Sequence, residues 1–306
     1  MAARLPRRIF AAEHTRETQG SYSVRLLRVG SPGGERPAVR TDAGRLLDLT
    51  SVTPEIDGAF LSSGGVDRVH AALEAGGLPE IDTEGLRIGA PIARPGKIVC
   101  VGLNYRDHAV ETGAAIPARP VVFMKDPGTV VGPYDEVLVP RGSTKTDWEV
   151  ELAVVIRRRA RYLAGPEEAS RVIAGYAVSH DVSEREFQLE YSPQWDLGKS
   201  CETFNPLGPW LVTTDEVADP QDLGLRLTVN GVKRQDGHTR DMIFPVHHIV
   251  SYLSQYMVLE PGDVINTGTP AGVALGLSGT PYLRPGDTVE LEIDGLGGQQ
   301  QTFGQA

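Results

Sequence analysis

The stretch DWEVELAVVI at residues 147–156 combines an apolar strand pattern with three acidic residues at alternate positions. In a strand, successive side chains point to opposite faces, so Asp147, Glu149 and Glu151 are expected on one face and the intervening apolar residues on the other. Acidic residues are depleted in strands, and like charges that neighbour each other on one face repel. Two explanations remain open: the acidic face meets water, or it surrounds a cation.

The composition limits the class of protein. The chain of 306 residues is long enough for about two domains. Its 35 glycines and 22 prolines indicate many turns, and hence a mainly β, α+β protein. A net charge of −10 argues against a nucleic-acid surface. Cys100 and Cys201 form no disulfide framework, and the sequence has no membrane-length apolar run. We therefore expect a cytoplasmic protein with neither nucleic-acid nor membrane partners.

Turn signals divide the chain into three parts. Residues 1–20 are expected to be a flexible extension. Residues 22–50 have the pattern of three short strands separated by SPGG and TDAG. A proline-rich approach at residues 78–97 then predicts a boundary between a small, β-rich N-terminal domain, residues 21–92, and a larger domain, residues 93–306.

The larger domain alternates strand and helix patterns. Strands are expected at 97–105, 120–125, 136–140 and 148–156, and helices at 106–114, 165–176 and 245–257. In the second helix, Pro166 would be the first helical residue and Gly175 the end. The GxSxG, HExxH, P-loop and GxGxxG motifs are absent, which argues against zincin chemistry and hydride transfer.

A second acidic segment, AVSHDVSEREFQ at residues 177–188, adds a carboxylate at the end of an apolar strand. Asp181 follows that strand, and His180 beside it would point to the opposite face. Carboxylates without a His-x-x-His or cysteine pair favour a hard cation. Mg²⁺ is the first candidate, with Mn²⁺ and Ca²⁺ as alternatives.

Further residues could take part in chemistry. His108 and Glu111 are neighbours on one face if their segment is a helix, and a carboxylate beside an imidazole makes a general base for water. Lys199, and the turn around Thr269, could supply an ammonium group and backbone N–H groups to a carboxylate. Each of these residues could equally be an ordinary surface or turn residue.

Seven segments, in this order, resemble the signature blocks of the fumarylacetoacetate hydrolase family. Within the family, the segments resemble the branch of shorter members, often called fumarylacetoacetate hydrolase domain-containing proteins, acylpyruvate hydrolases or hydroxyheptadienedioate isomerases. The resemblance spans about residues 96–297, and the strands at 22–50 resemble the small N-terminal domain of that branch. The segments are GLNYRDHAVE (102–111), FMKDPGTVVGPYDEV (123–137), DWEVELAVVI (147–156), SHDVSEREFQ (179–188), QWDLGKSCETFNPLGPWLV (194–212), VNGVKRQ (229–235) and PGDVINTGTPAGV (261–273).

This resemblance implies a fold, a metal site and an oligomeric state. The fold would be a rolled, mixed β-sheet catalytic domain, usually in a homodimer. Mg²⁺ or Mn²⁺ would be held by Glu149, Glu151 and Asp181. His108 and Glu111 would form a catalytic pair on a mobile lid helix, with Lys199 as a further catalytic residue. Lys199 would also contact the substrate, together with Lys125, Arg185, Gln188 and Thr269.

The resemblance also implies a reaction type. A 2-oxo acid would bind the metal, and water activated by His108 would cleave a C–C bond of a 2,4-dioxo acid through a metal-stabilised enolate. An isomerase or decarboxylase of a 2-oxo or 2-hydroxy unsaturated dioate from aromatic catabolism is the alternative, and a non-catalytic metal-binding protein is another. The chain departs from its relatives at Gly128, at residues 183–186 and at 189–195, which adjoin the expected substrate pocket.

Overall fold

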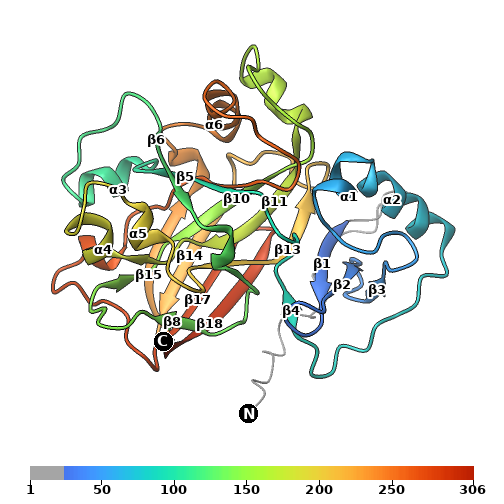
Figure 1. The fold of residues 1–306 in the computed structure, drawn as a ribbon, viewed down its shortest axis with the longest axis horizontal. Helices are drawn as coiled ribbons and strands as arrows, with labels where there is room; N and C mark the ends of the chain where they lie inside the picture. The colour runs from blue at the N-terminus through green and yellow to red at the C-terminus, as the bar shows by residue number, and fades with distance from the viewer. Residues whose placement is uncertain (1–23) are drawn as a thin grey trace.

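The computed structural model describes residues 24–306, and the extension predicted for residues 1–20 lies outside them. Figure 1 shows a small lobe, formed by the first strands and helices, beside a larger body built on β-sheets. No helix in the described part of the chain is long and apolar enough to cross a membrane. Both cysteines are free, as the sequence predicts.

The principal sheet runs through both the small lobe and the large body. Most of its pairs are antiparallel, whereas β16 and β5 are parallel, so the sheet is mixed. The small lobe joins it where β1 pairs with β13, with Arg25 opposite Val212. In spatial order the strands are β3 (Leu46–Asp48), β2 (Arg36–Arg40), β1 (Arg25–Val29), β13 (Asn205–Thr213), β11 (Ile173–His180), β10 (Val150–Ile156), β16 (Val264–Asn266), β5 (Ile98–Gly102) and β6 (Val121–Lys125), with β4 (Ile88–Gly89) beside β1 and β7 (Val130–Val131) beside β13.

A second sheet covers one face of the principal sheet. Its strands contact β10, β11 and β13, and a large apolar core lies between the two sheets. A second core packs the opposite face of the principal sheet against the small lobe. The strands of the second sheet, in spatial order, are β15 (Val232–His238), β14 (Gly224–Val229), β17 (Thr288–Ile293), β18 (Gly297–Gln305) and β8 (Val137–Val139). This arrangement confirms the predicted α+β, mainly β class with mixed sheets.

Helices are few and short. α1 (Gly58–Ser62) and α2 (Gly65–Ala75) belong to the small lobe, and α6 (Val246–Leu253) contacts the 3₁₀ turn η2 (Pro166–Arg171). The helices that bear on the site are α3 (Arg106–Glu111), α4 (Arg185–Leu189) and α5 (Asp196–Lys199). The strands and helices predicted from the turn and periodicity signals are present, with two exceptions.

The first exception is the helix predicted over residues 165–176. Only the 3₁₀ helix η2 forms; it ends at Arg171, and β11 begins at Ile173. Gly175 therefore lies inside a strand and does not end a helix. A Cβ on Gly175 would lie 2.1 Å from the carbonyl oxygen of Val212 on β13, so close approach of two strands requires this glycine.

The second exception concerns the acidic strand itself. The strand predicted over 148–156 begins only at Val150, as β10, and a separate short strand before it, β9 (Thr146–Asp147), pairs with β12 (Ser183–Glu184). Glu149 lies between the two strands. Asp147 shares Arg185 with Glu149, but its other partners are the Ala274 and Leu275 N–H groups, as described below.

Candidate metal centre and pocket

Three buried carboxylates meet where β10 begins and β11 ends. Val150 pairs with His180 across the two antiparallel strands, and the Asp181 N–H donates to the Glu149 carbonyl at 3.0 Å. One carboxylate oxygen from each of Glu149, Glu151 and Asp181 lies within 4.8 Å of the others. Their exposed fractions are only 4%, 2% and 0%. The register of two strands thus brings together acids that are 30 residues apart in sequence.

Two of these carboxylates are ion-paired. Lys199 Nζ lies 2.8 Å from Glu149 Oε2 and 2.9 Å from Asp181 Oδ2. Arg185 Nη2 lies 2.7 Å from Glu149 Oε1, and Lys125 Nζ lies 2.5 Å from Asp181 Oδ1. Burial opposes ionisation of Glu149, yet the charges of Lys199 and Arg185 outweigh it and hold the pKa of Glu149 well below its usual range.

Glu151 is the exception in this group. Its Oε2 accepts a hydrogen bond from the Gly268 N–H at 2.7 Å, but no lysine, arginine or histidine among residues 24–306 forms an ion pair with it. Burial, together with the negative charges of Asp181 and Glu149, raises the pKa of Glu151 well above its usual range. A buried acid without a cationic partner is the chemistry expected where a cation binds. The all-oxygen donor set fits a hard divalent ion.

Asp147 does not join the three-carboxylate group. Its Oδ2 accepts from Arg185 Nε at 2.8 Å, and its two oxygens accept from the Ala274 and Leu275 N–H groups at 2.7 and 3.0 Å. Arg185 therefore links Asp147 to Glu149. Of the three acids in the opening stretch, two belong to the candidate metal centre and the third anchors the turn η4 (Ala274–Gly276).

His108 and Glu111 lie on the short helix α3, beside the pocket. Their side chains are close, with 3.7 Å between Nδ1 and Oε2. Glu111 also accepts from the Gly272 N–H at 3.0 Å, which attaches α3 to the turn at 270–272. Burial raises the pKa of Glu111, but the neighbouring His108 and the hydrogen bond from the Gly272 N–H outweigh burial and lower the pKa overall.

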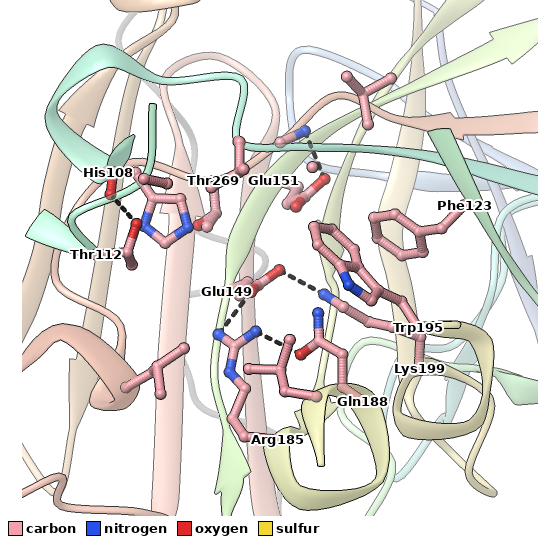
Figure 2. A pocket seen from close by; sticks show the side chains of 17 residues that line it. His108, Thr112, Phe123, Glu149, Glu151, Arg185, Gln188, Trp195, Lys199 and Thr269 are labelled. Carbon is pink, nitrogen blue, oxygen red and sulfur yellow. Dashed lines mark hydrogen bonds and ion pairs between the residues drawn. The ribbon is translucent and has the colours of Figure 1, made fainter. Parts of the chain in front are cut away.

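A pocket of about 250 Å³ connects these groups. It is small beside the range of roughly 300–1,000 Å³ typical of drug-sized ligands. Figure 2 shows His108 and Thr269 on one side, Glu149 and Arg185 along the base, and Phe123 with Trp195 on the other side. The residues proposed from sequence that line the pocket are His108, Glu149, Glu151, Arg185, Gln188, Lys199 and Thr269.

The remaining predicted residues lie behind this lining. Asp181 is fully buried beneath it, Lys125 is 1% exposed and bonded to Asp181, and Glu111 stands behind His108. Two of the lining residues are already engaged with protein groups. The Thr269 hydroxyl donates to the Val150 carbonyl at 2.9 Å, and all three nitrogens of the Arg185 guanidinium are hydrogen-bonded.

Gln188 and Lys199 have different capacities in this pocket. Gln188 Oε1 accepts from Arg185 Nη1 at 3.0 Å, which leaves its amide NH₂ as a donor toward the pocket (Figure 2). Burial lowers the pKa of Lys199, but the charges of Asp181 and Glu149 outweigh burial and raise it above its usual range. The raised pKa keeps the Lys199 ammonium group charged at neutral pH.

Sequence reasoning missed the apolar lining and one buried amide. Phe123 and Trp195 pack with ring centroids 5.4 Å apart on the pocket wall. Gln235, fully buried, bonds the Val150 N–H and the Thr269 hydroxyl. All three residues lie within the seven resembling segments, but nothing local in the sequence distinguishes them from core residues.

Comparison with known proteins identifies the class. The family model described as the C-terminal domain of fumarylacetoacetate (FAA) hydrolase matches residues 97–303. A Burkholderia cenocepacia protein, whose name assigns it provisionally as a hydrolase, is 48% identical over 280 residues, which cover 91% of this chain and 98% of the relative. This chain therefore belongs to the fumarylacetoacetate hydrolase family, as the sequence segments predict.

Solved structures support the same assignment and show the range of activities among relatives. Fumarylacetoacetate hydrolase from Exiguobacterium antarcticum has a TM-score of 0.80 and 35% identity, covering 93% of this chain and 100% of its own. Maleylpyruvate hydrolase from Sphingobium sp. SYK-6, solved with manganese(II) and pyruvate, has a TM-score of 0.76 and 28% identity, covering 92% of this chain and 99% of its own. A 2-hydroxyhepta-2,4-diene-1,7-dioate isomerase from Mycobacterium marinum has a TM-score of 0.69 and 32% identity, covering 92% of this chain and 99% of its own. Hydrolases and isomerases thus share this fold.

Proposed function

We propose that this protein is a metal-dependent hydrolase that cleaves the C3–C4 bond of an acylpyruvate-like 2,4-dioxo acid. One observation carries the proposal: the three-carboxylate group and the His108–Glu111 pair face or support one small pocket. A metal site and a candidate general base are the two components that this hydrolysis requires.

Glu149, Glu151 and Asp181 would hold Mg²⁺, with Mn²⁺ as the alternative and Ca²⁺ less suitable. When bound, the ion would supply a Lewis acid for the 2-oxo carboxylate end of the substrate. Lys199 and Lys125 neutralise the carboxylates and hold them in place, as their ion pairs indicate. The free amide NH₂ of Gln188 would donate to a substrate oxygen, and the Thr269 turn would form the adjacent wall.

His108 would act as the general base. It takes a proton from water, and the resulting hydroxide attacks the distal carbonyl carbon. The bond between that carbon and its pyruvyl neighbour breaks, and the electron pair remains on the pyruvyl carbon. The proton returns to this carbon, so one water converts the substrate into pyruvate and a carboxylate. Glu111, held by the Gly272 N–H, orients the imidazole and stabilises its protonated form.

The direct test is an assay of the purified protein with Mg²⁺ or Mn²⁺ on acylpyruvates, oxaloacetate and unsaturated 2-hydroxy dioates, with products identified by NMR. Pyruvate and a carboxylate released from an acylpyruvate would support the proposal. Carbon dioxide released from oxaloacetate, or a shifted double bond in a dioate, with every acylpyruvate left intact, would overturn it. The dioate is included in the assay because one of the similar structures is that of a dioate isomerase.

The resemblance also supports a homodimer as the working form. Exposed apolar side chains such as Val110, at 76% exposed, and Leu197, at 60%, are candidates for its interface. Light scattering coupled to gel filtration measures the mass directly. A monomer at micromolar concentration would contradict this part of the proposal.

A further inference from the structure

Among the described residues, every lysine and arginine that lines the pocket is already ion-paired, so none is available to pair with a second negative charge on a ligand. In the described chain, the lysine and arginine side chains that line the pocket are Lys199 and Arg185. Lys199 is ion-paired with two carboxylates, and so is Arg185. His108 brings no surplus positive charge, because its partner is the Glu111 carboxylate. A carboxylate at the far end of a ligand would meet none of these groups in an unpaired state.

The rest of the lining is largely apolar. Trp195 and Phe123 form a tilted aromatic pair, with 59° between their ring planes. Leu189 lies at the end of α4, and its side chain is 46% exposed, which places it at the pocket rim. The other apolar lining residues are Val101, Leu103, Ala114 and Leu275. Such a surface favours an apolar ligand tail, because an apolar group loses little hydration free energy when it leaves water.

The charge balance of the buried floor leads to the same conclusion. The buried side chains below the pocket have one carboxylate more than they have cationic groups. A bound divalent ion would change their net charge from −1 to +1. A ligand with one carboxylate would then bring the net charge to zero. A dioate would leave one negative charge uncompensated beside an apolar wall, which is unfavourable. The floor consists of Asp147, Glu149, Glu151, Asp181, Lys125, Arg185 and Lys199.

We infer that the substrate carries a single carboxylate, next to its 2-oxo group, and an uncharged alkyl or aryl group at its other end. This inference rests on the proposed function and narrows it to acylpyruvates with apolar acyl groups, as distinct from dioates. Trp195, Phe123 and Leu189 are the residues assigned to this preference. The maleylpyruvate hydrolase and dioate isomerase relatives have dioates in their names, so the inference separates this chain from them.

Binding of two matched, unreactive probes tests the inference without turnover. 2-Oxohexanoate and 2-oxoadipate have the same carbon count and differ in the distal group, methyl in one and carboxylate in the other. Titration in the presence of Mg²⁺, by calorimetry and by tryptophan fluorescence, should show that 2-oxohexanoate binds more than about tenfold more tightly than 2-oxoadipate. Equal affinities, or tighter binding of 2-oxoadipate, would overturn the inference.

A charge added at the rim provides the second arm. Leu189→Arg supplies an unpaired cation, so 2-oxoadipate should bind about two- to fivefold more tightly while 2-oxohexanoate changes little. Val232→Arg is the matched control, since Val232 on β15 is also exposed but does not line the pocket, and it should alter neither affinity. An equal gain for 2-oxoadipate in both variants would mean that overall charge, and not the pocket rim, sets the preference, and would overturn the assignment of Leu189.

Pyruvate distinguishes failure of the inference from failure of the proposed function. Pyruvate bound with Mg²⁺, but no preference between the two longer probes, would overturn only the inference about the distal group. No binding of pyruvate or of either probe with Mg²⁺ or Mn²⁺ would overturn the 2-oxo acid site itself, and the inference with it.

Discussion

Gln235 accepts a hydrogen bond from the backbone N–H of Val150, the residue between Glu149 and Glu151, at 2.9 Å. The same side chain donates through Nε2 to the Thr269 hydroxyl and to the Pro270 carbonyl, both at 2.8 Å. Gln235 comes from β15 of the second sheet, so one amide connects that sheet to the start of β10 and to the 268–270 turn. It positions the candidate metal ligands without touching the pocket.

Replacement of Gln235 should therefore affect both stability and metal binding. Gln235→Leu leaves the Val150 N–H unpaired in a buried place, at a cost of about 1–3 kcal/mol of unfolding free energy. Mg²⁺ affinity should fall as well, because the carboxylates on either side lose their backbone support. Urea unfolding and calorimetry measure the two effects. Gln300→Leu, at a half-buried position on β18, is the control and should change neither by a comparable amount.

The metal assignment predicts unequal effects for the three acids of the opening stretch. Glu149→Gln or Glu151→Gln removes a charge with little change of volume, and each should weaken Mg²⁺ binding more than about tenfold. Asp147→Asn should instead loosen the turn at Ala274 and lower the melting temperature, with Mg²⁺ affinity reduced far less. Calorimetric titration of the folded variants decides. Unchanged affinity in both glutamate variants would contradict the site.

The base assignment predicts a specific kinetic defect. His108→Ala should lower kcat on an acylpyruvate by about 10² to 10⁴, the usual contribution of a general base. Binding of 2-oxohexanoate should survive, since Lys199, Gln188 and the carboxylates are unchanged. Single-turnover kinetics with an acylpyruvate separate the two quantities. A variant that retains full kcat would exclude His108 from proton transfer.

The attachment of α3 predicts ligand-dependent protection. Glu111 and Asp107 attach this helix to the Gly272 and Ala271 N–H groups of the neighbouring turn, and Val110 on the same helix is largely exposed. Hydrogen exchange of residues 104–118 should slow when Mg²⁺ and pyruvate are added together, because gating segments belong to the less stable parts of a fold. Glu111→Gln should reduce this protection. Identical exchange with and without ligand would show that the segment is not a lid.

His180 predicts sensitivity to acid. Burial lowers its pKa from 6.5 to about 4, and its Nδ1 is paired with Gln301 Oε1 at 2.9 Å. The unfolded chain then binds the proton more readily, so stability is present above pH 6.5 and is lost as the pH falls toward 4. The loss should reach up to about 3 kcal/mol. Urea unfolding at pH 7 and pH 4.5 should show a smaller difference in His180→Gln than in the wild type, whereas His247→Gln should behave as the wild type.

Much of this protein was predictable from local sequence. The turn chemistry at 31–34 and 41–44 predicts the first three strands, and the pattern over 148–156 predicts β10. The ordered segments predict the family and the carboxylates of the candidate metal centre. These features depend on residues near one another in the chain, or on several segments kept in order. They need no knowledge of which strand lies beside which.

Other features depended on neighbours that the sequence does not reveal. Gly175 has the pattern of a helix end, yet it lies inside β11, where the Val212 carbonyl of the neighbouring strand passes too close for any Cβ. Asp147 has the same spacing as Glu149 and Glu151, but the break between β9 and β10 directs it to Arg185 and the 274–275 backbone. Tertiary structure alone decided that Glu151 is the acid of the candidate metal centre without a cationic partner among residues 24–306, because burial and ion pairing depend on contacts between segments distant in the chain.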